Sequence, residues 1–239
     1  MDNKNDQLFC NVSDIKIKTA KPILNENVIR EWFYHQRERT SIYYKKEILK
    51  CPPYWTDDEI LRSYKFVNTK RTWDRETKWL LANVINNSNV SYENKILNSF
   101  LFRVINKSET LHEINAPFDF SRMTVIDIDH TIRDITHDMS IKNPEYVFFS
   151  AAYILGGPKV NFGRFLEEKE HKTEMNMIIR MIKFVFYNQD KIIKGVKSAA
   201  NQLEVFNHLK SFAGIGDFLA YQIFVDLTYI VDFPFTEMN

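Results

Sequence analysis

The sequence predicts a mainly α-helical fold, with at most a small β element in the middle of the chain. Apolar residues recur at helical spacing through most of the sequence, which is typical of helices packed on a core. Residues that cap helices precede several of these segments. A Gly-Ile-Gly turn within Leu209–Tyr229 separates a short helix from an apolar one. With 239 residues, 44% of them hydrophobic, the chain can bury a substantial core.

Residues 1–25 are predicted to form an irregular arm. Asn25 is suited to cap a helix over residues 26–39, whose apolar residues follow helical spacing. Residues 42–49 continue this pattern until Cys51-Pro52-Pro53 breaks it, because proline lacks a backbone donor and restricts the residue before it. Residues 26–239 are interpreted as a single α-helical domain.

Thr56 is the predicted N-cap of the next helix, because three carboxylates follow it, where the helix dipole is positive. Two further helices are predicted at residues 74–84 and 92–106. Residues 123–128 fit either a short strand or the start of a helix. In the last third of the chain, the predicted helices cover residues 174–187, 190–197 and 203–212.

The turn Gly214-Ile215-Gly216 uses two of only six glycines in the chain. Glycine permits a positive φ and lets another molecule approach the backbone closely. The N–H groups that open the following helix, with the helix dipole behind them, suit a DNA phosphate. The same spacing also fits an ordinary turn between two packed helices, so the motif by itself leaves both interpretations open.

A net charge of +1 excludes a strongly basic nucleic-acid coat, so any contact with DNA is expected at a local basic patch. Cys10 and Cys51 are the only cysteines, and they form no CxxC pair, which indicates a reducing cytoplasm. The polar N-terminus lacks the apolar core of a signal peptide. No apolar run is long enough to span a membrane, so no membrane partner is expected.

The densest polar segment is residues 37–77, where Asn68, Arg71, Asp74 and Arg75 lie close together in the sequence. Arg71 and Arg75 share a face if one helix spans both. The cluster fits a solvated helix face with salt bridges, each worth about 0–1 kcal/mol. It also fits an anion pocket, because arginine binds phosphate in a planar, bidentate way.

Aspartates and histidines gather at residues 127–138, where mixed ligand types suggest a metal. His130 and His137 are seven residues apart, however, and no tight ligand pair is present. An exposed acidic helix or loop is preferred, and no metal site is predicted.

Two blocks of residues resemble a known family. The first block is Glu38-Arg39, Ile42-Tyr43, Lys45, Pro53, Trp55-Thr56, Asp58, Ile60-Leu61, Phe66, Asn68, Arg71, Asp74-Arg75 and Thr77. The second block is Gly214-Ile215-Gly216, residues 218–222 and Asp226-Leu227. In this order they resemble the α-glutamyl/putrescinyl thymine pyrophosphorylases of bacteriophages, which are related to helix-hairpin-helix DNA glycosylases. The resemblance covers residues 30–107 and 203–239.

The resemblance implies a glycosylase-like helical fold and an enzyme that modifies phage DNA in the cytoplasm of the infected bacterium. An amine donor, which is glutamate, glycine or putrescine, would displace pyrophosphate from 5-pyrophosphoryloxymethyluracil in double-stranded DNA. The implied catalytic residues are Asp74 as the base, Asn68 on the uracil edge, and Arg71 and Arg75 on the pyrophosphate. Substrate binding is assigned to Arg39, Tyr43, Lys45, Trp55 and Asp58, and DNA binding to Gly214, Ile215 and Gly216. Mg²⁺ could assist the leaving pyrophosphate, but no cofactor is demanded.

The chain departs from that family at its end. Relatives continue with an acidic stretch and a Gly-Pro-Gly segment, whereas this sequence ends at Thr236-Glu237-Met238-Asn239. We therefore hypothesise that a second polypeptide supplies the closing segment. Two other functions stay open: a DNA glycosylase acting on a modified base, and a non-catalytic DNA-binding subunit of a modification complex.

Overall fold

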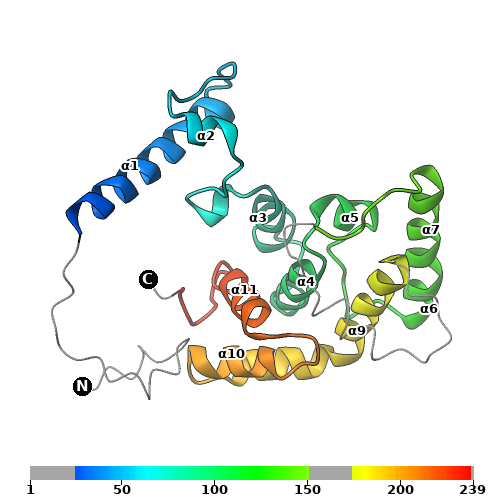
Figure 1. Cartoon of the computed structure of the whole chain (residues 1–239). Coiled ribbons are helices and arrows are strands. Elements are labelled where there is room, and N and C mark those ends of the chain that lie inside the picture. The colour runs from blue at the N-terminus through cyan, green and yellow to red at the C-terminus, as the bar shows by residue number, and fades with distance from the viewer. Residues whose placement is uncertain (1–24, 151–173, 238–239) are drawn as a thin grey trace. The chain divides into compact units, whose positions relative to one another are not determined.

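The computed structural model describes residues 25–150 and 174–237 (Figure 1). All regular structure within these ranges is helical, which confirms the predicted class. The predicted arm, apart from Asn25, lies outside the described residues. The chain divides into two compact units, Met1–Lys78 and Trp79–Asn239.

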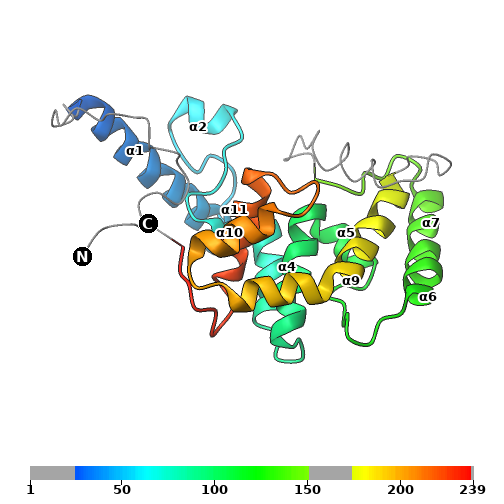
Figure 2. The same cartoon turned by 90° about the horizontal axis from the view of Figure 1, so that it is seen from below.

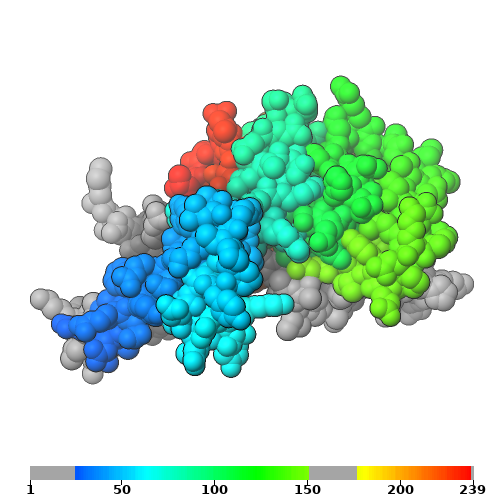
Figure 3. Space-filling view, turned by 90° about the horizontal axis from the view of Figure 1, so that it is seen from above, coloured from blue at the N-terminus to red at the C-terminus, as the bar shows by residue number. Residues whose placement is uncertain are grey.

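In the first unit, helix α1 (Glu26–Tyr43) begins where the sequence predicts. The side chain of Asn25 accepts hydrogen bonds from two backbone N–H groups of the first turn, at 3.0 and 3.4 Å. The helix continues as a π-helical turn (Tyr44–Ile48), which confirms the predicted extension. Much of α1 is exposed, including Trp32 and Phe33, and its side chains form the blue ridge of Figure 3.

Helix α2 (Glu59–Ser63) begins later than predicted. Its N-cap is Asp58, whose carboxylate accepts from the backbone N–H of Leu61 at 3.0 Å. The hydroxyl of Thr56 instead donates to Glu38 of α1 at 3.1 Å. The oxygen of Thr56 accepts from the backbone N–H of Asp58 at 3.2 Å, ahead of the helix. The prediction of Thr56 as the cap is therefore wrong, because the helix begins at Glu59.

Asp74 separates a 3₁₀ turn (Arg71–Trp73) from helix α3 (Arg75–Leu80). Its backbone is extended, with ψ 142°, and its carboxylate accepts from the backbone N–H of Thr77 at 3.0 Å. A π-helical turn (Leu81–Ile85) continues the helix, as predicted for residues 74–84. No single helix spans Arg71 and Arg75, so the condition for a shared face is not met.

The second unit is built around helix α4 (Tyr92–Ile105), which is buried at every residue from 96 to 105. A helix that is buried on all sides needs partners around it. Helix α4 packs against α9 (Glu174–Ser198) and α11 (Asp217–Leu227), and α10 (Gln202–Lys210) packs on both of these (Figure 2). Helix α9 is continuous where the sequence predicted two helices.

The remaining helices of this unit follow α4 in the chain. They are α5 (Ser108–Glu113), α6 (Val125–Asp127), a π-helical turn (Ile128–Ile132) and α7 (Arg133–Lys142). Thr124 and Asp127 bond reciprocally in a capping box at the start of α6. Residues 123–128 therefore begin a helix, and the alternative of a strand is wrong.

A buried ion pair joins α4 to α11. Arg103 donates from Nε to one oxygen of Asp226 at 2.5 Å and from Nη2 to the other at 2.8 Å. Its Nη1 donates to Asn106 at 3.0 Å. The two charged side chains are only 3% and 0% exposed. This bidentate contact fixes α11 against the core.

Candidate nucleic-acid interface

The structure confirms the hairpin predicted between α10 and α11. Gly214 has φ 85°, a conformation that other residues rarely adopt. Ile215 is 4% exposed and anchors the turn in the core. Gly216 has φ −86°, and a Cβ added there would meet no atom within 4 Å. Neither backbone geometry nor packing among the described residues requires glycine at 216, and the open space there would let another molecule approach the backbone closely.

Gly216 is also the N-cap of α11, where it offers no side chain to the first N–H groups of the helix. The helix dipole makes this end attractive to an anion. Asp217 places a carboxylate there, and Lys210 pairs with it across the hairpin at 2.5 Å. Both side chains are substantially exposed, so this ion pair is weak and its lysine can turn toward a phosphate.

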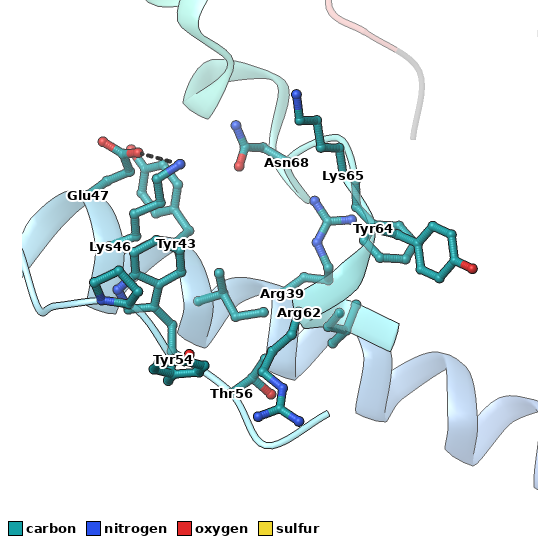
Figure 4. Close-up of a pocket in the computed structure, with 15 residues that line it drawn as sticks. Arg39, Tyr43, Lys46, Glu47, Tyr54, Thr56, Arg62, Tyr64, Lys65 and Asn68 are labelled. Carbon is teal, nitrogen blue, oxygen red and sulfur yellow. Dashed lines mark ion pairs between the residues drawn. The ribbon is translucent and has the colours of Figure 1, made fainter. Parts of the chain in front are cut away.

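A pocket of about 660 Å³ lies within the first unit, between the end of α1 and residues 53–68 (Figure 4). Its charged lining residues are Arg39, Lys46, Arg62, Lys65 and Glu47. Its aromatic lining residues are Tyr43, Tyr54, Trp55, Tyr64 and Phe66. Cations beside aromatic rings can bind the phosphates and the bases of nucleic acids.

Arg39 rises from α1 into this pocket, toward Asn68 and Lys65 (Figure 4). Its guanidinium carbon lies 5.0 Å from the centre of the Phe66 ring. Partial burial lowers the pKa of Arg39 from its ordinary value, although arginine stays charged at neutral pH. Among the described residues, its guanidinium has neither an ion pair nor a hydrogen bond. A partly buried cation of this kind suits an anionic ligand.

Asn68 and Tyr43 are both held by Trp73. The amide nitrogen of Asn68 donates to the carbonyl of Trp73 at 3.0 Å. The ring of Tyr43 stacks on the indole of Trp73, with centroids 4.1 Å apart and planes 5° apart. Tyr43 therefore forms a wall of the pocket, and one of its faces is already covered.

Other predicted binding residues support the loop between α1 and α2. Lys45 donates to the carbonyl of Trp55 at 2.7 Å, and the Trp55 indole donates to the carbonyl of Cys51 at 2.8 Å. Trp55 still lines the pocket, whereas Lys45 and Asp58 do not. These contacts hold the pocket wall in place.

The pocket does not include all of the predicted catalytic residues. Asn68 lines the pocket, whereas Arg71, Asp74 and Arg75 do not. Asp74 is engaged as the cap of α3, and Arg75 pairs with Glu76 at 2.8 Å. The structure thus brings Arg39, Tyr43, Trp55 and Asn68 together at one cavity.

The sequence prediction missed several lining residues. These are Lys46, Tyr54, Arg62, Tyr64 and Lys65. The segment Arg62-Ser63-Tyr64-Lys65-Phe66 interleaves cations with aromatic rings, and this signal could have identified the segment.

Among residues 25–150 and 174–237, no helix combines the length and the apolar character needed to cross a membrane. In the same residues, no three acidic, histidine or cysteine side chains converge in a way that could hold a metal ion.

The chain is 25% identical over 227 residues to the 5-hmdU DNA kinase of Bacillus phage SP10. The match covers 93% of this chain but 34% of the relative, so the chain spans about a third of that protein's length. No solved structure matches. A sequence model described as "5-hmdU DNA kinase, helical domain" matches residues 26–239.

These comparisons correct the sequence-based function. The resemblance to thymine pyrophosphorylases is wrong, and so are the amine transfer with release of pyrophosphate and the glycosylase and binding-subunit alternatives that accompanied it. The residues that carried the resemblance include Asp58, Asp74 and Tyr43, whose contacts here support the fold, and such residues do not identify a reaction. The chain belongs to the family of 5-hmdU DNA kinase helical domains.

Proposed function

We propose that this chain acts in the phosphorylation of 5-hydroxymethyluracil in phage DNA, and that its helical regions bind the DNA. The family match over residues 26–239 carries this proposal. The related Bacillus phage SP10 protein is named as a 5-hmdU DNA kinase. The open space beside Gly216 of the hairpin and a cationic, aromatic pocket support the DNA-binding part.

The reaction needs a nucleophile that a protein can reach. The hydroxymethyl oxygen on C5 of the base would form the new bond to the γ-phosphorus of a nucleoside triphosphate. The bond between the γ-phosphorus and the bridging oxygen would break, so that the nucleoside diphosphate leaves, and the proton of the hydroxyl group would pass to the solvent. Mg²⁺ is expected with the triphosphate, because metal ions neutralise the charge that develops in phosphoryl transfer.

Mass spectrometry of nucleotides tests the reaction. The chain is incubated with ATP, Mg²⁺ and a duplex that contains 5-hydroxymethyluracil, and the DNA is then digested to mononucleotides by a nuclease, without a phosphatase. We expect a phosphate ester on the hydroxymethyl group, and no change in a matched thymine duplex. Recovery of the hydroxymethyl nucleotide without a phosphate on its hydroxymethyl oxygen would contradict the proposal.

A further inference from the structure

We propose that the pocket of the first unit holds the target nucleotide after it has left the duplex, with Asn68 on the uracil edge and Arg39 on the phosphate. This inference rests on the proposed function and names the substrate of that site. Enzymes that act on a base in DNA commonly extrude it into a pocket, where its pairing edge is read. A volume of about 660 Å³ is within the range of small-ligand sites.

The chemistry of Asn68 fits uracil. Because its nitrogen donates to the carbonyl of Trp73, the orientation of the amide is fixed, and its oxygen stays available as an acceptor. That oxygen can accept the N3–H of uracil, and the second N–H of the amide can donate to a ring carbonyl. Cytosine offers an acceptor at N3 and an amino group in place of O4, so it fits this arrangement poorly.

Tyr54 is suited to stack on the base. It lines the pocket and is 84% exposed, and its backbone has φ 79°. This conformation is costly for a bulky residue, and such strain gathers at functional sites. Tyr43, in contrast, already stacks on Trp73. An exposed ring held at the rim can supply a face to a base.

The charges favour a nucleotide of DNA over a free nucleoside triphosphate. Arg39 lacks an anionic partner among the described residues. The side chain of Lys65 lies on the same side of the pocket (Figure 4). Among the lining residues, Glu47 is the one carboxylate, and it lies 3.6 Å from both Lys46 and Lys50. A triphosphate carries Mg²⁺, which carboxylates usually help to hold. This pocket offers cations and rings, which suit a single phosphodiester.

One titration with two signals tests the inference. A duplex carries a single 5-hydroxymethyluracil, a neighbouring 2-aminopurine that brightens when the base beside it unstacks, and a terminal fluorescein whose anisotropy reports binding. We expect both signals to rise with the wild-type chain. We also expect at least a tenfold preference over a 5-hydroxymethylcytosine duplex, which is roughly what a bidentate base contact provides.

Variants separate the roles. Asn68→Ala should abolish the preference between the two bases, and Arg39→Gln should weaken binding to both duplexes. Arg30→Gln is the matched control, because it removes one exposed charge from the same helix outside the pocket. Tyr54→Ala should remove the 2-aminopurine signal with an unchanged melting temperature, and Tyr54→Phe should restore it.

The outcomes are distinguishable. A rise in anisotropy without a rise in 2-aminopurine fluorescence overturns the inference and leaves the proposed function in place. ATP that displaces the duplex from the wild-type chain but not from Arg39→Gln identifies a triphosphate site, which also overturns the inference. Failure to bind any of the duplexes overturns both proposals.

Discussion

At the scale of single residues, Gly195 and Gly216 differ in what surrounds them. A Cβ on Gly195, in α9, would lie 2.1 Å from the ring of His208, whereas a Cβ on Gly216 would meet nothing within 4 Å. Alanine in place of glycine normally favours a helix by about 1 kcal/mol. At Gly195 the clash should outweigh that gain, since the rigid ring also packs edge-on against Phe212.

We therefore expect Gly195→Ala to lower the free energy of unfolding by about 1–3 kcal/mol, measured by chemical denaturation. Gly216→Ala is the control and should change stability little. In a His208→Ala background, where the ring is absent, Gly195→Ala should become stabilising. Equal effects of Gly195→Ala in both backgrounds would show that the ring is not the cause.

The same histidine makes stability depend on pH. Burial lowers the pKa of His208, and the charge of Lys191 lowers it further. A hydrogen bond with the backbone of Lys191 raises this pKa but does not cancel the two effects. The folded state therefore favours the neutral ring. Its contribution to stability is complete above the unfolded pKa of about 6.5 and is lost as the pH falls through the folded pKa.

Melting temperatures between pH 8 and pH 5 test this dependence. Wild-type stability should fall below about pH 6.5, and the fall should be smaller in His208→Gln, which cannot be protonated in this range. Parallel curves for the two proteins would assign the acid sensitivity to other groups.

At the hairpin, two neighbouring substitutions should act on DNA binding in opposite directions. Gly216→Ala adds a methyl group where a phosphate would approach, so the affinity for duplex DNA should fall. Asp217→Asn removes a carboxylate from the positive end of α11 and releases Lys210, so the affinity should rise about two- to fivefold, as expected for a charge at a helix end. Anisotropy titrations at two salt concentrations measure both changes. Affinities that stay equal in all three proteins would exclude the hairpin from the interface.

At the scale of elements, the Arg103–Asp226 pair decides where α11 lies on the core. Asp226→Asn leaves a buried arginine without its counter-charge and should destabilise the fold by about 3–5 kcal/mol. Replacing both residues, as in Arg103→Met with Asp226→Leu, should restore most of the loss, because no unpaired charge remains. Chemical denaturation of the single and double variants measures the coupling. A double variant as unstable as the single one would show that hydrogen bonds, rather than the charge, hold the helices.

Local sequence signals predicted the helices well and their boundaries less well. Asn25 caps α1 as expected, but Thr56 does not cap α2, because the helix begins at Glu59 and Asp58 caps it. Arg71 and Arg75 do not share a helix face, because Asp74 separates the 3₁₀ turn from α3. Short-range patterns cannot show which of several neighbouring polar residues becomes the cap.

At the scale of the whole molecule, the sequence alone could not assemble the pocket. Arg39 and Asn68 are far apart in the chain and meet because the segment after α1 folds back beside it. Both were predicted as site residues, but neither Tyr54 nor Lys65 was. The resemblance, which included capping and stacking residues such as Asp58, Asp74 and Tyr43, pointed to the wrong family, whereas the match over residues 26–239 places the chain among 5-hmdU DNA kinase helical domains.

The central proposal is that this chain binds 5-hydroxymethyluracil in DNA, the base whose hydroxyl group is to be phosphorylated. The most direct measurement is a competition between a labelled 5-hydroxymethyluracil duplex and unlabelled duplexes that differ at one base. A site built to bond a hydroxyl discriminates strongly against an analogue that lacks it. The thymine duplex should therefore compete at least about fivefold more weakly than the hydroxymethyluracil duplex, a small part of what such a site can reach. Equal competition by the two duplexes would contradict the account.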